Sequence, residues 1–330
     1  MPLSEFQAKA FFVLVFSHLY LFIVSENYIF PTQVKSGQTV AIIAPSGPVE
    51  RSALNDTVSA LESWGLRVAF GKSTFHNTGY LAGSDDDRLA YIQWAINDDE
   101  IDLILCARGG FGATKILDQI NFSNLLVKPK WLIGYSDITA IHLAMQDMGY
   151  GSVHGPMATS FQREGAQGSV NALKQWLFEN IASPIESTQS SFNKIGQASG
   201  PITGGNLALI VDSLGTASEI QTDHKLLFIE DIGEPMYKID RMLTQLKRAG
   251  KFDNASGLII GDFSELNDTT AAQYWQDVVI KLFDKFDFPI GFGFPIGHEP
   301  MNMPIIMGKN YQLKVLGDRA LLILDEDLPR

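Results

Sequence analysis

The stretch Trp131-Leu132-Ile133-Gly134-Tyr135-Ser136-Asp137-Ile138-Thr139 decides both the fold class and the position of a candidate nucleophile. A short apolar run ends in Gly-Tyr-Ser-Asp and turns at once into a helical pattern of apolar residues. This pattern indicates a nucleophile elbow, in which a tight turn between strand and helix lifts one hydroxyl to the edge of a sheet. We therefore expect Ser136 at the carboxyl end of a buried strand.

The alternation of strand and helix recurs along the first half of the chain. Apolar strands are expected at 39–44, 66–70, 102–106 and 131–133, and helices at about 50–64 and 84–96. Ser84 is the expected N-cap of the second helix, with three aspartates in its first turn. Strands that alternate with helices imply βαβ units and a parallel sheet. The first domain, 34–182, is therefore predicted to be α/β.

A polar segment at 183–199, rich in Ser, Gln and Gly, is the expected linker to a second domain at 200–330. The expected elements of that domain are a helix at 207–214, a strand ending at Glu230, a helix at about 236–248, a strand at 257–261 and a hairpin of 311–315 with 320–324.

Composition excludes several classes of function. The chain has 330 residues and a net charge of -12, and no basic patch that could neutralise the phosphates of a nucleic acid. Its one cysteine, Cys106, excludes internal disulfides. The six histidines are scattered, and no Cys/His cluster has zinc spacing, so we expect no metal site.

The N-terminal segment 1–30 does not share the globular pattern. An apolar run from Ala10 to Val24 follows Lys9 and is interrupted only by Ser17 and His18. The run is short for a membrane span but fits the apolar region of a signal peptide, whereas Glu5 argues against one. Export or membrane anchoring, or a start codon assigned too early, would each account for it.

The turn Arg108-Gly109-Gly110-Phe111-Gly112 follows directly on an expected strand. Backbone N–H groups of a Gly-rich turn at such a place can bind an anion or line an oxyanion hole. The turn lacks the Lys-Ser/Thr of a P-loop and the spacing of a dinucleotide fingerprint. Beside an elbow in the next strand, we interpret it as part of a catalytic site.

A serine nucleophile requires a base and an acid that orients it. The segments Leu226–Asp231 and Pro295–Pro300 offer Glu230 and His298 for these roles, and His154 is a second candidate base that spacing alone does not exclude. Two rival interpretations concern the nucleophile itself: Ser136 could be an ordinary helix N-cap, and Cys106 could act in its place. Cys106 lies within an expected strand, which favours a buried core role for it.

Taken together, these segments resemble the LD-carboxypeptidase family, serine peptidases that include muramoyl-tetrapeptide carboxypeptidases and microcin C immunity hydrolases. The resemblance runs in order from residue 34 to 330 through Gln38–Gly47, Arg108–Gly112, Gly134–Asp137, His154–Pro156, Gly204–Asn206, Glu230–Asp231 and Gly297–His298. The segment before about residue 30 lies outside it.

The resemblance implies a catalytic triad of Ser136, Glu230 and His298, and thereby chooses His298 over His154. It implies an oxyanion hole made by the backbone N–H groups of Gly110 and Asp137. The implied fold is a doubly wound N-terminal domain that carries the nucleophile, and a C-terminal domain with a small β-barrel-like core that carries the acid and the base. Homodimers, a cytoplasmic location and the absence of any metal or organic cofactor are also implied.

The expected activity is removal of the terminal D-alanine from a murein tetrapeptide, with Arg108 as the candidate for binding the free carboxylate of the substrate. The alternative within the family is hydrolysis of an aminoacyl-nucleotide antibiotic of the microcin type. A rival from another class is a non-catalytic ligand-binding protein with two α/β lobes, which would not need Ser136.

Overall fold

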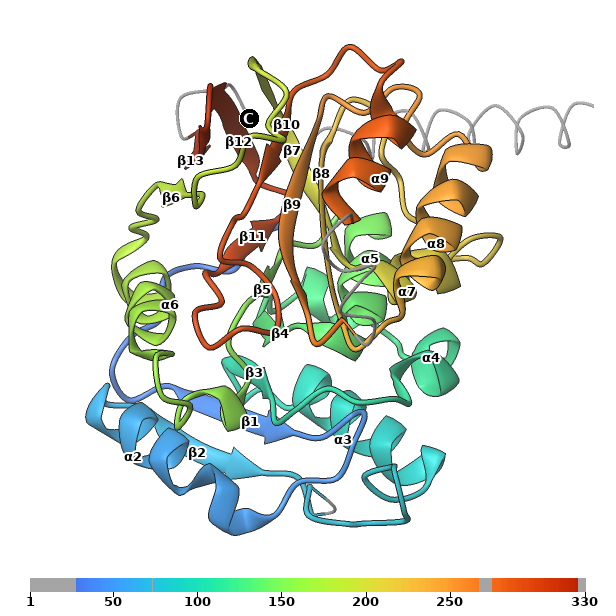
Figure 1. The fold of residues 1–330 in the computed structure, drawn as a ribbon. Coiled ribbons are helices and arrows are strands. Elements are labelled where there is room, and N and C mark those ends of the chain that lie inside the picture. Colours follow the sequence, from blue (N-terminus) through green and yellow to red (C-terminus); the bar gives the residue numbers. More distant parts are fainter. Residues whose placement is uncertain (1–27, 73, 267–274, 326–330) are drawn as a thin grey trace, which may run out of the picture.

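The computed structural model describes residues 28–72, 74–266 and 275–325 (Figure 1). The apolar run 10–24 lies outside these residues. Within the described ranges, no helix combines the length and the apolar character that crossing a membrane requires.

The first sheet has six strands in the order β11-β5-β4-β3-β1-β2. Its strands are β1 (Thr39–Ile43), β2 (Arg67–Phe70), β3 (Leu103–Cys106), β4 (Trp131–Gly134), β5 (Ser152–His154) and β11 (Ile305–Met307). The first five pair in parallel, as the alternation of strands and helices predicted, and β11 is antiparallel to β5. A segment expected in the second domain thus completes the first sheet.

Helices cover both faces of this sheet. Alternate side chains of a strand point to opposite faces, and accordingly Val40 and Ile42 belong to one apolar cluster while Ala41 and Ile43 belong to another. The first face is covered by α2 (Asn55–Ser63) and α6 (Gln167–Glu179), and the second by α3 (Asp85–Asn97), α4 (Ala113–Ile116) and α5 (Thr139–Asp147). The domain is therefore doubly wound, as expected.

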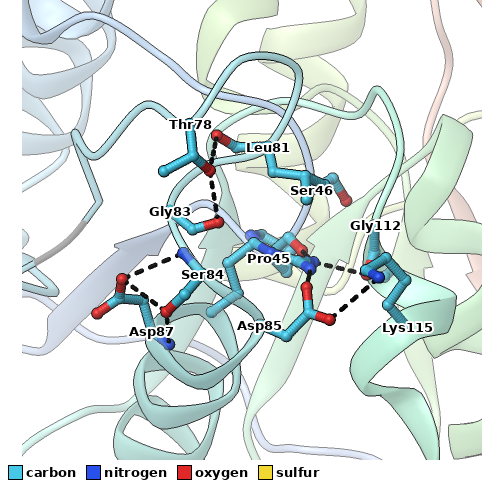
Figure 2. A network of polar contacts seen from close by, with 12 residues as sticks. Pro45, Ser46, Thr78, Leu81, Gly83, Ser84, Asp85, Asp87, Gly112 and Lys115 are labelled. Atoms are coloured by element: carbon cyan, nitrogen blue, oxygen red, sulfur yellow. Dashed lines mark hydrogen bonds and ion pairs between the residues drawn. The ribbon is translucent and has the colours of Figure 1, made fainter.

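Helix α3 begins with the cap that the sequence predicts. The Ser84 hydroxyl accepts a hydrogen bond from the backbone N–H of Asp87, and the Asp87 carboxylate accepts one from the backbone N–H of Ser84 (Figure 2). This reciprocal capping box satisfies two N–H groups that the first helical turn leaves without partners. Short 3-10 helices complete the first domain: η1 (Arg51–Leu54), η2 (Leu117–Gln119), η3 (Ser123–Leu126), η4 (Ser136–Ile138) and η5 (Ala158–Ser160).

The second sheet has seven strands in the order β10-β9-β8-β7-β12-β13-β6. Its strands are β6 (Ile185–Glu186), β7 (Gly196–Asn206), β8 (Leu226–Ile232), β9 (Gly257–Ser264), β10 (Ile290–Phe292), β12 (Asn310–Leu316) and β13 (Arg319–Leu324). Strands β7 to β10 are parallel, and β12 and β13 form the predicted hairpin.

The segment 183–199, expected to be a linker, closes the second sheet on itself. It contains β6 and the start of β7, and between them Thr188 donates its N–H to the carbonyl of Gly293 while Lys194 forms a β-bridge with Ile290. The Ser187 hydroxyl accepts the N–H of Ala320. The Asn193 side chain accepts the N–H of Phe292 on β10, so polar side chains that suggested a linker help to join the two edges, which makes the barrel-like core.

Three helices lie together on one side of this sheet: α7 (Leu207–Asp212), α8 (Met236–Arg248) and α9 (Trp275–Phe283) (Figure 1). They bury an apolar cluster against β8, β9 and β10. On the inner side, Ile305 and Met307 of β11 pack with residues of β8 and β12, whereas Ile306 packs in the first domain. Strand β11 therefore joins the two cores.

Residues 28–30, expected to belong to the N-terminal extension, pack against the first domain. Ile29 forms a β-bridge with Tyr150, and the Phe30 ring lies 6.3 Å from that of Trp131. The globular part of the chain therefore begins no later than Tyr28.

Candidate active site

The carboxyl ends of β1, β3, β4 and β5 meet at one edge of the first sheet, where ligands bind in folds of this type. The loop after β1 contacts the Gly-rich turn after β3, since the Gly47 N–H donates to the Gly109 carbonyl at 3.0 Å. Ser136 follows β4 directly, and His154 ends β5. The loops that the sequence analysis singled out in the first domain therefore lie together at this edge of the sheet.

Ser136 occupies the tight turn that the sequence predicts. It is half-buried and has φ 64°, a left-handed conformation that residues other than glycine rarely adopt. Ser136 starts η4, and α5 follows at once. A Cβ added to Gly109 would lie 2.8 Å from the Ser136 Cβ and 2.9 Å from its Oγ, so the turn after β3 has to be glycine there to approach the hydroxyl.

Asp137 and Gly110 are the residues whose backbone N–H groups were expected to form an oxyanion hole. Asp137 lies in the first turn of η4, where N–H groups have no partner within the helix. The Asp137 N lies 3.5 Å from the Cβ position of Gly109, so the two turns adjoin. Gly110 has φ 115°, open to glycine alone, and its N–H makes no hydrogen bond to any residue that the structure describes.

The Asp137 side chain ties three loops of the edge together. Its Oδ2 accepts hydrogen bonds from the Ser46 hydroxyl at 2.5 Å and from the Ala113 N–H at 2.8 Å. Burial raises the pKa of this carboxyl, and the two hydrogen bonds oppose the rise. The side chain of Asp137 thus holds the neighbouring loops in place, a role that is separate from the one expected for its backbone N–H.

Arg88 on α3 holds the same loops and had no prediction attached to it. Its side chain is fully buried, and Nη1 donates to the carbonyls of Pro45 and Gly112 at 2.6 Å each. Its Nη2 pairs with Asp85. Asp85 also binds Lys115 at 3.1 Å on the surface (Figure 2). An arginine directly after three aspartates was the one sequence signal of this network.

Glu230 and His298 form a buried pair supplied by the second domain. His298 Nδ1 lies 2.7 Å from Glu230 Oε2, and the side chains are 10% and 0% exposed. Burial favours the neutral carboxyl, but the adjacent His298 and His154 outweigh it and lower the pKa of Glu230 to about 2. Burial likewise opposes the charge on His298, yet Glu230 prevails and raises the pKa of the imidazole.

The first domain contacts this pair directly. The ring of Tyr135, the residue before Ser136, lies 4.9 Å from the His298 ring in an edge-on arrangement. Arg163 Nη1 donates to the His298 carbonyl at 2.8 Å. The imidazole is therefore held between the elbow of one domain and the carboxylate of the other.

The remaining predicted residues lie as follows. Arg108 is exposed and donates to the Pro48 carbonyl at 3.2 Å. Cys106 is buried within β3, and burial raises the pKa of its thiol, which disfavours the nucleophilic thiolate. His154 has no exposure, and its Nε2 is 4.0 Å from Glu230 Oε1.

Asp262 is a carboxyl at this site that the sequence analysis did not single out. It lies on β9, and the Cβ position of Gly297 is 3.1 Å from both its Cβ and that of Glu230. Burial, and then the charges of Glu299 and Glu230, raise the pKa of Asp262 to about 7. Among the described residues, no group of three His, Cys, Asp or Glu side chains is arranged to hold a metal ion.

Comparisons with known proteins agree with this architecture. The chain matches the LD-carboxypeptidase N-terminal domain over residues 40–155 and the LD-carboxypeptidase C-terminal domain over residues 199–313. It is 38% identical over 302 residues to a probable murein peptide carboxypeptidase of Bacillus subtilis, covering 88% of this chain and 93% of the relative. It is 26% identical to a murein tetrapeptide carboxypeptidase of Pseudomonas aeruginosa, covering 83% and 92%.

Solved structures show the same fold. The crystal structure of a muramoyltetrapeptide carboxypeptidase from Oxalobacter formigenes matches with a TM-score of 0.77 and 27% identity, over 87% of this chain and 99% of that one. The structure of MccF in complex with glutamyl sulfamoyl guanosine matches with a TM-score of 0.80 and 18% identity, over 91% and 99%. The matches to both domains, and the 38% identity to the Bacillus relative over most of both chains, lead to one conclusion: the chain belongs to the LD-carboxypeptidase family.

Proposed function

We propose that this chain is a serine carboxypeptidase that hydrolyses the bond between an L-centre and the terminal D-alanine of murein tetrapeptides. The observation that carries the proposal is the buried hydrogen bond between Glu230 and His298, packed against the residue that precedes Ser136. The names of the relatives in Bacillus and Pseudomonas support the substrate class.

The hydrogen bond to Glu230 assigns a separate role to each nitrogen of His298. Because Nδ1 donates to the ionised carboxylate, Nε2 is left as the base that takes the proton from the Ser136 hydroxyl. The Ser136 oxygen then attacks the carbonyl carbon of the peptide bond, and His298 returns the proton to the amine of the departing D-alanine. A water molecule releases the acyl group by the same steps in reverse.

The backbone N–H groups of Gly110 and Asp137 are the proposed oxyanion hole for the tetrahedral intermediates. Such a donor stabilises the transition state by roughly 3 kcal/mol in well-studied enzymes, because it needs no reorganisation during the reaction. Arg108 is exposed in the same turn as Gly110, and we assign to it the free carboxylate of the terminal residue.

The experiment that tests the proposal measures free D-alanine released from murein tetrapeptide by the purified protein. We expect turnover by the unmodified chain and none by Ser136→Ala. Cys106→Ala is the matched control, because it removes the rival nucleophile and is expected to stay active. Turnover by Ser136→Ala close to that of the unmodified chain would refute the nucleophile, and tight peptide binding without hydrolysis would favour the two-lobe binding protein.

The alternative substrate, an aminoacyl nucleotide of the microcin type, is tested in parallel with an aminoacyl sulfamoyl adenosine. The likeness to MccF stands at 18% identity and shows the fold alone, so the murein peptide is the first choice. Release of the amino acid from this compound, with no D-alanine from tetrapeptide, would reverse that choice.

We further propose that the protein acts as a homodimer without a metal or organic cofactor, and in the cytoplasm. The family resemblance supports these assignments. Light scattering of the purified protein tests the first, and activity after chelation tests the second. Fractionation of cells tests the third, and an exported or membrane-bound product would instead give a role to residues 10–24.

A further inference from the structure

His154 is a fully buried histidine that the mechanism above does not use. It ends β5 and pairs with Gly134 of β4 and Ile305 of β11, at the junction of the two domains. Within the described part of the chain, neither of its ring nitrogens has a hydrogen-bond partner. Because buried polar groups are normally hydrogen-bonded, two unsatisfied nitrogens on one ring require an explanation.

Glu230 has a matching unsatisfied atom. Its Oε2 accepts from His298, whereas its Oε1 is buried and accepts no hydrogen bond from any described residue. This Oε1 is the atom that lies 4.0 Å from His154 Nε2. The carboxylate therefore stands between two imidazoles, one at hydrogen-bond distance and one about an ångström beyond it.

The His154 ring is held in place by aromatic neighbours. The Phe228 ring lies edge-on at 4.9 Å, and Phe228 precedes Glu230 by two residues on β8, so both side chains leave the same face of that strand. The rings of Tyr135 and His142 lie at 6.1 and 6.3 Å. These contacts keep one edge of the imidazole directed at the carboxylate.

We propose that His154 is a positioning residue: its Nε2 edge, 4.0 Å from Oε1 of Glu230, attracts that oxygen electrostatically, so that Oε2 stays directed at Nδ1 of His298. The proposal rests on the serine-peptidase function above, because it acts through the same Glu230–His298 pair. A carboxylate bound at one oxygen can rotate about its last side-chain bond, whereas one held at both oxygens cannot. His154 thereby orients the acid that orients the base.

The charges around the pair decide how the proposal can be measured. His298 is faced by Glu230 and Asp231 from β8 and by Arg163, and Glu230 is faced in addition by His154 from β5 and Asp262 from β9. Contact with Glu230 raises the pKa of His298. If Glu230 rotates away, this elevation is lost, so the pH at which activity falls on the acid side moves down.

Three substitutions separate positioning from packing. The amide of Gln in His154→Gln can place an N–H near the position of Nε2, the shorter amide in His154→Asn cannot, and His154→Phe fills the space without any donor. Phe228→Leu is the packing comparison: it disturbs the apolar contacts around His154 but leaves the ring nitrogens intact, so it is expected to label faster than His154→Phe. Thermal unfolding of each variant shows whether it is folded.

The measurement is the rate at which a fluorophosphonate probe labels Ser136, followed against pH, because this rate depends on His298 and Glu230 but not on the natural substrate. We expect His154→Phe and His154→Asn to label about 10- to 100-fold more slowly, the range found when an outer hydrogen-bond partner is lost at metal sites. We expect their acid limbs to lie at lower pH. His154→Gln should recover most of the rate.

The outcomes are distinct. Equal rates and an unmoved acid limb in folded His154→Phe or His154→Asn would overturn the role of His154, while labelling of the unmodified chain keeps the serine peptidase. Should His154→Phe fail to fold, the comparison of Gln with Asn decides in its place, and equal rates for these two would count against positioning. If the unmodified chain is not labelled at all, the serine-peptidase function fails and this proposal falls with it.

Discussion

Nδ1 of His298 lies 2.7 Å from Oε2 of Glu230, a carboxylate with no exposure to solvent. The bond joins β8 to the loop that follows β10, so it depends on the closed second sheet. Because the pKa of Glu230 is lowered to about 2, the carboxylate is ionised throughout the physiological range. The proposed base and the acid proposed to orient it are thus in contact before any substrate binds.

The first prediction concerns the charge of Glu230. Glu230→Gln keeps an oxygen near Nδ1 but removes the charge that stabilises the imidazolium, so turnover should fall by about 10⁴-fold, as when the buried Asp of a trypsin-like triad becomes Asn. Release of D-alanine under saturating tetrapeptide measures the loss. Glu219→Gln is the control and should stay active, because it only breaks an ion pair between the loop after α7 and Lys251, which follows α8. A Glu230→Gln enzyme within tenfold of the unmodified one would show that the bond is dispensable.

The second prediction is the pH dependence. As the proposed base, His298 would act only when neutral. Glu230 raises its pKa, so the acid limb of kcat/KM should lie above the ordinary histidine value of 6.5. A pH–rate profile checks this, and a limb at or below that value would contradict it.

The third prediction concerns how the Glu230–His298 pair affects the stability of the protein at different pH values. The lowered pKa of Glu230 adds stability that is present above 4.5 and lost as the pH falls toward about 2. The raised pKa of His298 adds stability that is present below 6.5 and lost as the pH rises through its value in the folded protein. The contribution of the pair is therefore largest between 4.5 and 6.5. Thermal unfolding of the unmodified chain and Glu230→Gln below, within and above this range measures it, and a difference that stays the same at all of these pH values would oppose the assignment.

The fourth prediction concerns the approach of the two turns. Gly109→Ala would place a methyl group 2.8 Å from the Ser136 Cβ, so the hydroxyl must shift and activity should drop by about 10²-fold, the cost of misplacing a reacting group by roughly an ångström. Gly168→Ala is the control, since its new methyl group would meet only the flexible end of Met301. Equal kinetics for the two variants would mean that the elbow tolerates the displacement.

The fifth prediction concerns Arg88. Arg88→Met leaves the carbonyls of Pro45 and Gly112 without their donor, so the free energy of unfolding should fall by about 3 kcal/mol. Lys115→Ala removes only the exposed partner of Asp85 and should change stability by less than about 0.5 kcal/mol. Urea unfolding measures both, and a similar small change in the two variants would show that the buried network contributes little.

Local patterns of the sequence predicted much of the fold. The helix expected at about 236–248 is α8, the cap at Ser84 begins α3, and the turn at Ser136 joins β4 to η4 and α5. Each of these features depends on residues that lie close together in the sequence: the regular spacing of apolar residues, the side chains that cap a helix, and the residues of a tight turn. The same locality explains why the β12–β13 hairpin could be predicted.

Features that depend on distant partners were misjudged or missed. The segment 183–199 was expected to link domains, but it carries β6 and closes the second sheet through Gly293 and Ile290. Strand β11 was not predicted, because three apolar residues give no local sign that they will pair with β5. Arg88 was missed for the same reason, since its partners are carbonyls of loops elsewhere in the chain.

The sequence by itself determined the α/β class, the elbow at Ser136 and the family to which the chain belongs, because apolar period and motif order are properties of the chain. Only the tertiary structure decided which atoms meet: Nδ1 of His298 with Oε2 of Glu230, and His154 with the other oxygen of that carboxylate. These contacts join residues of two strands and a loop, and burial together with the neighbouring charges sets the pKa values that follow from them. Neither the contacts nor the burial exists until both sheets have packed around β11.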